Sequence, residues 1–114
     1  MSIEETIEVE EEELKGVEEI AVPGFSLSIA VSPRFQRVGR PLKIHGTHKL
    51  LGFPAPTRVV ISVKGPESFE TKIFTDPLGN YSYTRKFRRR GWYWVQAYTE
   101  PPTARSRRIW FLIY

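Results

Sequence analysis

The chain has 114 residues, 17 lysines and arginines, 13 carboxylates and no cysteine. This length allows at most one domain, and the lack of cysteine excludes disulfides and thiolate metal sites. Residues 1–22 carry nine glutamates and one lysine, a net charge of −8, whereas residues 23–114 carry 16 lysines and arginines against four carboxylates, a net charge of +12. Two parts of opposite charge attract each other, so the front of the chain is expected to dock on a basic surface.

The first 24 residues form an acidic N-terminal arm. Its apolar residues lie near helical spacing until Glu10 interrupts them, whereas residues 6–9 alternate like a strand. Four consecutive glutamates repel one another in either form, so we expect the arm to be disordered when alone. It is predicted to bury its apolar side chains only against a partner, and a solvated tail is the alternative. The predicted contact residues are Ile3, Ile7, Val9, Glu10, Glu11, Glu12, Glu13 and Leu14.

Neither a membrane span nor a secretory signal is visible in the sequence. No stretch approaches the ~18 apolar residues that cross a bilayer, and the N-terminus has no basic region followed by an apolar one. One asparagine, two glutamines and nine prolines are typical of a heat-adapted source.

From residue 25 onward the apolar residues recur with a period of two, and no segment shows helical periodicity. Turn signals separate the segments, among them Gly79, which is expected to take a positive φ in the turn of residues 76–80. Seven short strands with regularly spaced turns predict an all-β sandwich over residues 25–114, with an open barrel as the alternative. The predicted strands are residues 25–29, 42–47, 58–64, 69–75, 81–87, 92–99 and 107–114.

Four segments resemble bacterial and archaeal immunoglobulin-like repeats: residues 39–46 (GRPLKIHG), 59–63 (VVISV), 75–83 (TDPLGNYSY) and 91–97 (GWYWVQA). The resemblance covers about residues 25–114 and implies a seven-stranded immunoglobulin-like β-sandwich. In that family such domains are modules of adhesins, surface layers and virion proteins, which bind or space rather than catalyse. Tyr93 resembles the tyrosine corner of these sandwiches, whose hydroxyl bonds the backbone of the preceding turn. Arg85 departs from the usual apolar alternation of its strand.

The chemistry of an enzyme is not apparent. His45 and His48 are three apart, but no nearby carboxylate completes a metal site, so a structural or exposed pair is the favoured interpretation. No carboxylate pair, serine elbow or glycine-rich phosphate loop is present. We therefore expect a non-enzymatic protein without cofactor, metal or small-molecule substrate.

The last two predicted strands carry an aromatic face. If they pair, four large aromatic residues share the outer side of the sheet, and a patch of that size is typical of an interface. The alternative is that the arm, or the stems of arginine and lysine side chains, covers these rings within one molecule. The four residues are Trp92, Trp94, Trp110 and Tyr114.

Two groups of basic residues flank the sixth strand. The first is Lys86, Arg88, Arg89 and Arg90, and the second is Arg105, Arg107 and Arg108. Because the strand runs between them, the groups are expected at opposite ends of the sandwich, where each can contact an acidic neighbour.

These observations predict a structural or interaction protein whose arm docks on the basic surface of a neighbouring copy or of a larger assembly, for example by adding a strand to a sheet edge. The resemblance favours a virion decoration protein or filament subunit located in the virion, with the cell surface or cytoplasm as alternatives. A sugar-binding or adhesion module that uses the exposed tryptophans is the second hypothesis. A nucleic-acid binder that uses residues 88–90 is the third, against which the acidic arm counts.

Overall fold

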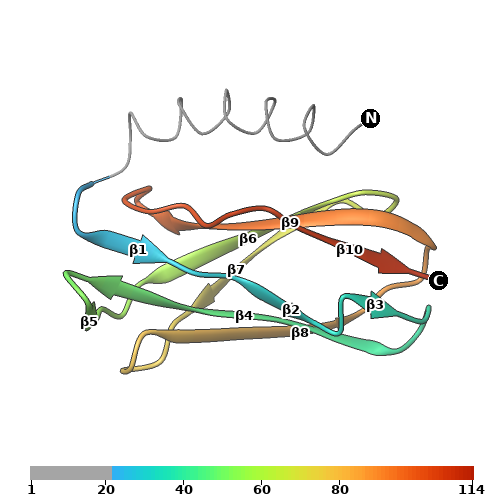
Figure 1. Cartoon of the computed structure of the whole chain (residues 1–114), viewed down its shortest axis with the longest axis horizontal. Helices are drawn as coiled ribbons and strands as arrows, with labels where there is room; N and C mark the ends of the chain where they lie inside the picture. Colours follow the sequence, from blue (N-terminus) through green and yellow to red (C-terminus); the bar gives the residue numbers. More distant parts are fainter. Residues whose placement is uncertain (1–21) are drawn as a thin grey trace.

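The computed structural model describes residues 22–114, which form two stacked β-sheets and contain no helix (Figure 1). In the first sheet a long central strand pairs with all the others: β4 (Pro41–Leu50) with β1 (Phe25–Leu27), β2 (Ala30–Ser32), β5 (Phe53–Pro54) and β8 (Asn80–Lys86). The second sheet has the order β3 (Phe35–Gln36), β10 (Ile109–Ile113), β9 (Gly91–Glu100), β6 (Arg58–Lys64) and β7 (Phe69–Phe74). All pairs are antiparallel except β3 with β10.

The predicted all-β sandwich is confirmed, whereas residues 22–114 contain ten strands rather than seven. The first predicted strand, residues 25–29, is shortened to β1, and β2 begins directly after the predicted range; the two strands pair with different parts of β4. Strands β3 and β5 have two residues each, too few to show an alternating pattern. Among residues 22–114 no strand pair joins the two sheets, so the open barrel is excluded.

The core lies between the sheets and is built from the inward residues of each long strand. Burying each such side chain contributes roughly 1.5–3 kcal/mol. Phe87, Tyr93 and Phe111 form an aromatic cluster at its centre, with ring centroids 4.9 to 5.4 Å apart. The fully buried aliphatic residues around this cluster are Leu42, Ile44, Val59, Ile61, Val63, Val95 and Ile113.

Two residues singled out from the sequence hold turns. The Tyr93 hydroxyl donates a hydrogen bond of 2.6 Å to the carbonyl oxygen of Arg89, four residues earlier, which is the bond that a tyrosine corner makes. Gly79 has a φ of +80°, and a Cβ there would lie 2.4 Å from the carbonyl oxygen of His48. Both features require the residue that the sequence provides.

The arm contacts predicted for residues 3–14 lie outside the described residues. No helix among residues 22–114 has the length and apolar character that crossing a membrane requires.

Candidate interaction surfaces

The four carboxylates of residues 23–114 all have partners inside the domain. Glu100 forms salt bridges with Arg58 at 3.1 Å and Lys72 at 3.0 Å. Asp76 accepts hydrogen bonds from the backbone amides of its own turn, and Glu70 lies 3.4 Å from the Tyr98 hydroxyl. The fourth carboxylate, Glu67, is also engaged. Most of the positive charge of the domain is therefore not balanced by its own carboxylates.

Glu67 connects the β6–β7 turn to the β8–β9 turn. Its Oε2 accepts hydrogen bonds from the backbone amides of Arg88 at 2.7 Å and Arg89 at 2.9 Å, and its Oε1 lies 3.7 Å from Arg85. Burial raises the pKa of the Glu67 carboxyl, but these amides, the Tyr93 hydroxyl and Arg85 outweigh it and hold the pKa below its ordinary value. Burial and the Glu67 charge raise the pKa of Tyr93 to about 12. The carboxylate thus fixes the backbone of the turn that carries three consecutive arginines.

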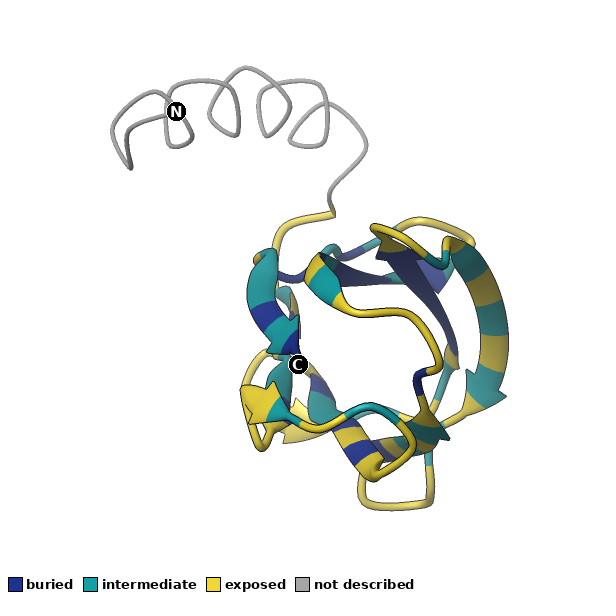
Figure 2. Ribbon diagram, turned by 90° about the vertical axis from the view of Figure 1, so that its right-hand side faces the viewer, coloured by how far each residue is buried: buried dark blue, intermediate teal, exposed yellow. Residues whose placement is uncertain are grey.

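These arginines meet a second basic loop at one end of the sandwich. The Gly39 amide donates to the Phe87 carbonyl at 2.9 Å, and Pro41 lies opposite Lys86 in the sheet, so the loop before β4 lies beside the β8–β9 turn. Figure 1 shows this end on the right, next to the C-terminus, and Figure 2 views it end-on with largely exposed loops. We call this surface the basic end; its exposed cations are Arg37, Arg40, Lys86, Arg88, Arg89 and Arg90.

Three aromatic side chains are exposed at the basic end. Phe35 is 61% exposed, Trp92 is 55% exposed and Tyr114 is 50% exposed. The Phe35 and Trp92 rings meet edge to face at 6.3 Å on either side of Leu112, which pairs with both residues. The Arg37 guanidinium lies 5.5 Å from the centre of the Tyr114 ring. The basic end therefore carries exposed rings as well as exposed cations.

The predicted aromatic face exists, but its four residues differ in exposure. Trp94 lies directly opposite Trp110 across β9 and β10, and both are half-buried, whereas Trp92 and Tyr114 are exposed. The Arg108 guanidinium lies 4.0 Å from the centre of the Trp94 ring and covers it, in line with the alternative that arginine stems shield these rings. The indole Nε1 of Trp110 is buried, and nothing within residues 22–114 accepts a hydrogen bond from it.

The second basic group flanks a bulge beside β9. Arg105 pairs with Tyr98 and Ile109 pairs with Val95, which leaves one extra residue on the segment that leads into β10. The Arg105 Nε is buried and has no hydrogen-bond partner among the described residues. We call this surface the Arg105–Arg108 groove; its volume is ≈ 390 Å³, and its lining residues are Ser62, Glu70, Trp94, Gln96, Tyr98, Pro102, Arg105 and Arg108.

The acidic arm joins the domain beside this groove. The amide of Val22 donates a hydrogen bond of 3.0 Å to the carbonyl oxygen of Thr103, two residues from Arg105. Arg90 directly precedes the first residue of β9, and Thr103 lies three residues after the last residue of β9. A ten-residue strand spans about 33 Å, so the root of the arm and the basic end lie at opposite ends of the sandwich (Figure 1).

The structure also brings together residues that the sequence reasoning left out. Arg37, Arg40 and Phe35 join the first basic group, although about 50 residues separate them along the chain. Their position depends on β3, which pairs in parallel with β10 over two residues. So short a strand leaves no periodic signal, and only the arginines themselves could have drawn attention to the loop.

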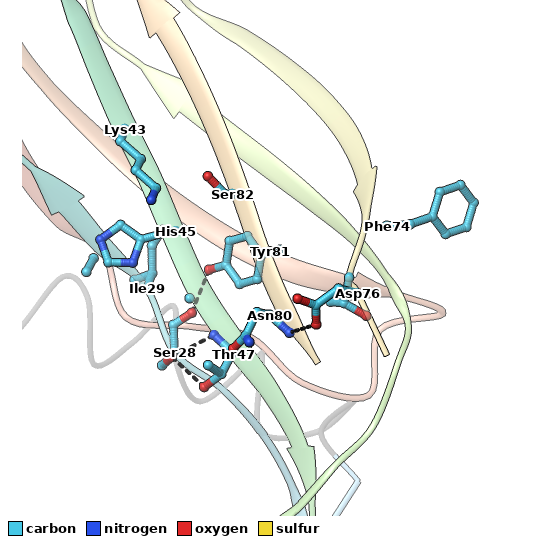
Figure 3. Close-up of a pocket in the computed structure, with 13 residues that line it drawn as sticks. Ser28, Ile29, Lys43, His45, Thr47, Phe74, Asp76, Asn80, Tyr81 and Ser82 are labelled. Carbon is cyan, nitrogen blue, oxygen red and sulfur yellow. Dashed lines mark hydrogen bonds between the residues drawn. The ribbon is translucent and has the colours of Figure 1, made fainter. Parts of the chain in front are cut away.

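A second groove, of ≈ 720 Å³, lies over β4 and β8 of the first sheet (Figure 3). Several of its polar groups bond one another: the Tyr81 hydroxyl donates to the Ser28 carbonyl at 2.5 Å, and the Ser28 and Thr47 hydroxyls are 3.1 Å apart. His45 pairs with Ser82 across the strands, while Asp76 caps its own turn. This arrangement assembles no recognisable catalytic group.

The histidine pair is split by the pleat of β4. His45 is half-buried in the groove of the first sheet, whereas His48 is 2% exposed in the interior. The His48 ring stacks on Phe25 at 5.6 Å, and its Nδ1 lies 2.5 Å from the Ala55 carbonyl oxygen. Within residues 22–114 no three histidines, cysteines or carboxylates come together in a group that could hold a metal ion.

Comparison with known proteins identifies the fold. The sequence matches no family model and no curated protein. Among solved structures the chain is similar to the D0-D1 domain of intimin (TM-score 0.56, 12% identity, 76% of this chain and 45% of that one) and to the superoxide reductase (neelaredoxin) of Ignicoccus hospitalis (0.56, 10%, 78% and 80%). It is also similar to a CARDB domain from Pyrococcus furiosus in complex with di-metal ions (0.53, 10%, 79% and 87%).

These similarities define the class of fold, a β-sandwich with immunoglobulin-like neighbours. The chain spans less than half of the intimin structure that it matches. At 10 to 12% identity the likeness shows the architecture alone.

Proposed function

We propose that this chain is a non-enzymatic interaction module whose acidic arm docks on the Arg105–Arg108 groove of a neighbouring copy. The observation that carries this proposal is the hydrogen bond between Val22 and Thr103, which places the root of the arm beside the groove. A polyanionic segment thus leaves the domain next to one of its basic groups. The carboxylate that lines the groove, Glu70, lies 3.4 Å from the Tyr98 hydroxyl.

The chemistry of the groove fits a glutamate-rich segment. The buried Nε of Arg105 has no acceptor among residues 22–114, and carboxylate oxygens are the strongest acceptors that a side chain offers. Half-buried Trp94, which lines the groove, offers apolar surface to the isoleucine and valine side chains between the glutamates.

The arm is long enough to act between molecules. It has 21 residues before Val22, and an extended chain of that length spans up to roughly 70 Å. Two copies that exchange arms form a closed dimer if the contact is two-fold, whereas an exchange that does not close produces a filament. A role as a virion decoration protein or filament subunit is the finer form of the proposal, and it is supported by the sequence motifs alone.

The mass of the full chain in solution tests the proposal. We expect an oligomer by light scattering at low salt, with the mass falling towards that of the monomer as salt screens the charges. A variant with Gln in place of Glu10, Glu11, Glu12 and Glu13 should be monomeric. The double variant Arg105→Glu with Arg108→Glu should also be monomeric. Lys43→Glu with Lys49→Glu makes the same charge change on the first sheet and should leave the mass unchanged.

Charge exchange distinguishes docking from a loss of folding. A variant that combines Arg105→Glu and Arg108→Glu with replacement of the glutamates at positions 10 to 13 by arginine should form the oligomer again. A full chain that is monomeric at every concentration, or an oligomer that the groove variants leave intact, would overturn the proposal. Electron micrographs of the source particle with this subunit located would test the virion assignment.

A further inference from the structure

We propose that the basic end binds single-stranded nucleic acid, with phosphates on its arginines and bases on its exposed aromatic rings. This activity goes beyond arm-mediated assembly, because it uses a different set of residues and a different partner. The juxtaposition of Arg37, Arg88, Arg89 and Arg90 with Phe35 and Trp92 carries the inference.

The charge at this end has no internal counterpart among the described residues. The three salt bridges between described residues involve Arg58, Lys72 and Arg85. The carboxylate of Glu67 contacts the arginine turn, but its oxygens already accept the amides of Arg88 and Arg89 and face Arg85. The cluster therefore carries excess positive charge that attracts an external anion, and a phosphate backbone is a regular array of such anions.

The exposed rings favour unpaired bases over other anions. Phe35 and Trp92 are each more than half exposed and meet edge to face at 6.3 Å, and Tyr114 lies under the guanidinium of Arg37. Flat rings interleaved with cations are the surface on which single-stranded nucleic acids stack. A duplex keeps its bases stacked inside and would leave these rings unused, and an acidic peptide has no flat groups to place on them.

The backbone of the basic end is held in place before any ligand arrives. Glu67 bonds the amides of the arginine turn, the Tyr93 hydroxyl bonds the Arg89 carbonyl at 2.6 Å, and Gly39 bonds Phe87 across to the neighbouring loop. Side chains presented from a fixed backbone lose less conformational freedom on binding. The two basic loops are therefore organised as one surface.

Fluorescence anisotropy of the full chain with a labelled oligothymidine of about 15 nucleotides, the upper range of such sites, tests the inference. We expect tighter binding to the single strand than to a duplex of equal length, and affinity that falls steeply with salt. Trp92→Ala should weaken binding roughly tenfold. Binding should be abolished by the triple variant Arg88→Glu, Arg89→Glu and Arg90→Glu. The control Lys43→Glu with Lys49→Glu should change the affinity little.

Two measurements keep the test decisive. Urea unfolding shows whether each variant is folded. If Trp92→Ala does not fold, Phe35→Ser on the two-residue edge strand takes its place. Equal affinity for duplex or for an oligoglutamate peptide, or no effect of the aromatic substitutions, would overturn the inference in favour of a general anion surface. Because the assembly test changes different residues and measures mass rather than nucleic-acid binding, failure of one proposal leaves the other standing.

Discussion

The guanidinium carbon of Arg85 lies 3.8 Å from the centre of the Phe69 ring, and its Nη2 lies 3.7 Å from the Glu67 carboxylate. Arg85 is the residue that breaks the apolar alternation of β8, and the structure shows why the break is tolerated. The long side chain covers the rim of the core with its stem and places its charge between a ring and a carboxylate. An apparent defect in the pattern is thus a contact between the two sheets.

Replacing Arg85 with Met should lower the free energy of unfolding by about 1 kcal/mol, because it removes the contact with the ring and the ion pair while retaining an apolar stem. Urea unfolding at neutral pH measures the change. Arg85→Lys is the matched control: it retains the charge but not the planar group that stacks on Phe69. Equal stability of the Met variant and the wild type would show that the contact contributes nothing.

Removing the Tyr93 hydroxyl should be costly although the ring stays packed. Tyr93→Phe leaves the Arg89 carbonyl without its donor at 2.6 Å, so we expect a loss of about 1–2 kcal/mol of unfolding free energy. Tyr114→Phe removes a hydroxyl from an exposed ring and should change stability by less than about 0.5 kcal/mol. Denaturant titration of the two variants side by side tests the difference, and equal losses would contradict it.

The dependence of stability on pH should reflect protonation of the Glu67 carboxyl. The pKa of its carboxyl lies below the ordinary value of 4.5, so its contribution is present above that value and is lost as pH falls through the lower folded-state pKa. We expect the wild type to lose stability in this acid range more steeply than Glu67→Gln does. Thermal unfolding across the acid range measures both proteins, and parallel curves would show that Glu67 does not contribute.

Two glycines with nearly the same φ separate backbone strain from steric collision. Gly79 has a φ of +80° and Gly39 a φ of +82°, but a Cβ at Gly79 would meet the His48 carbonyl oxygen at 2.4 Å, whereas one at Gly39 would meet nothing within 4 Å. Gly39→Ala should therefore cost about 1 kcal/mol, the strain alone, and Gly79→Ala should cost more than about 2 kcal/mol. Similar midpoints of urea unfolding for both variants would contradict this explanation.

Much of the sandwich could be predicted from local pattern. Strand β6 has the predicted bounds, and β9 exceeds its predicted range by one residue at each end, because a long run of alternating apolar residues is informative on its own. The two-residue strands β3 and β5, and the three-residue strand β2 that follows the first predicted strand, could not be predicted. Such segments owe their form to the strand beside them rather than to their own sequence.

For the surfaces, the sequence by itself determined the chemistry available: an acidic front, a basic remainder, and tryptophans near the basic groups. Only the tertiary structure decided which of these residues meet. It placed Phe35, Arg37 and Arg40 beside the Arg88 turn, covered Trp94 with Arg108, and set the root of the arm against Thr103. Charge and side-chain type are properties of single residues, whereas proximity between distant residues arises from strand pairing and from the stacking of two sheets.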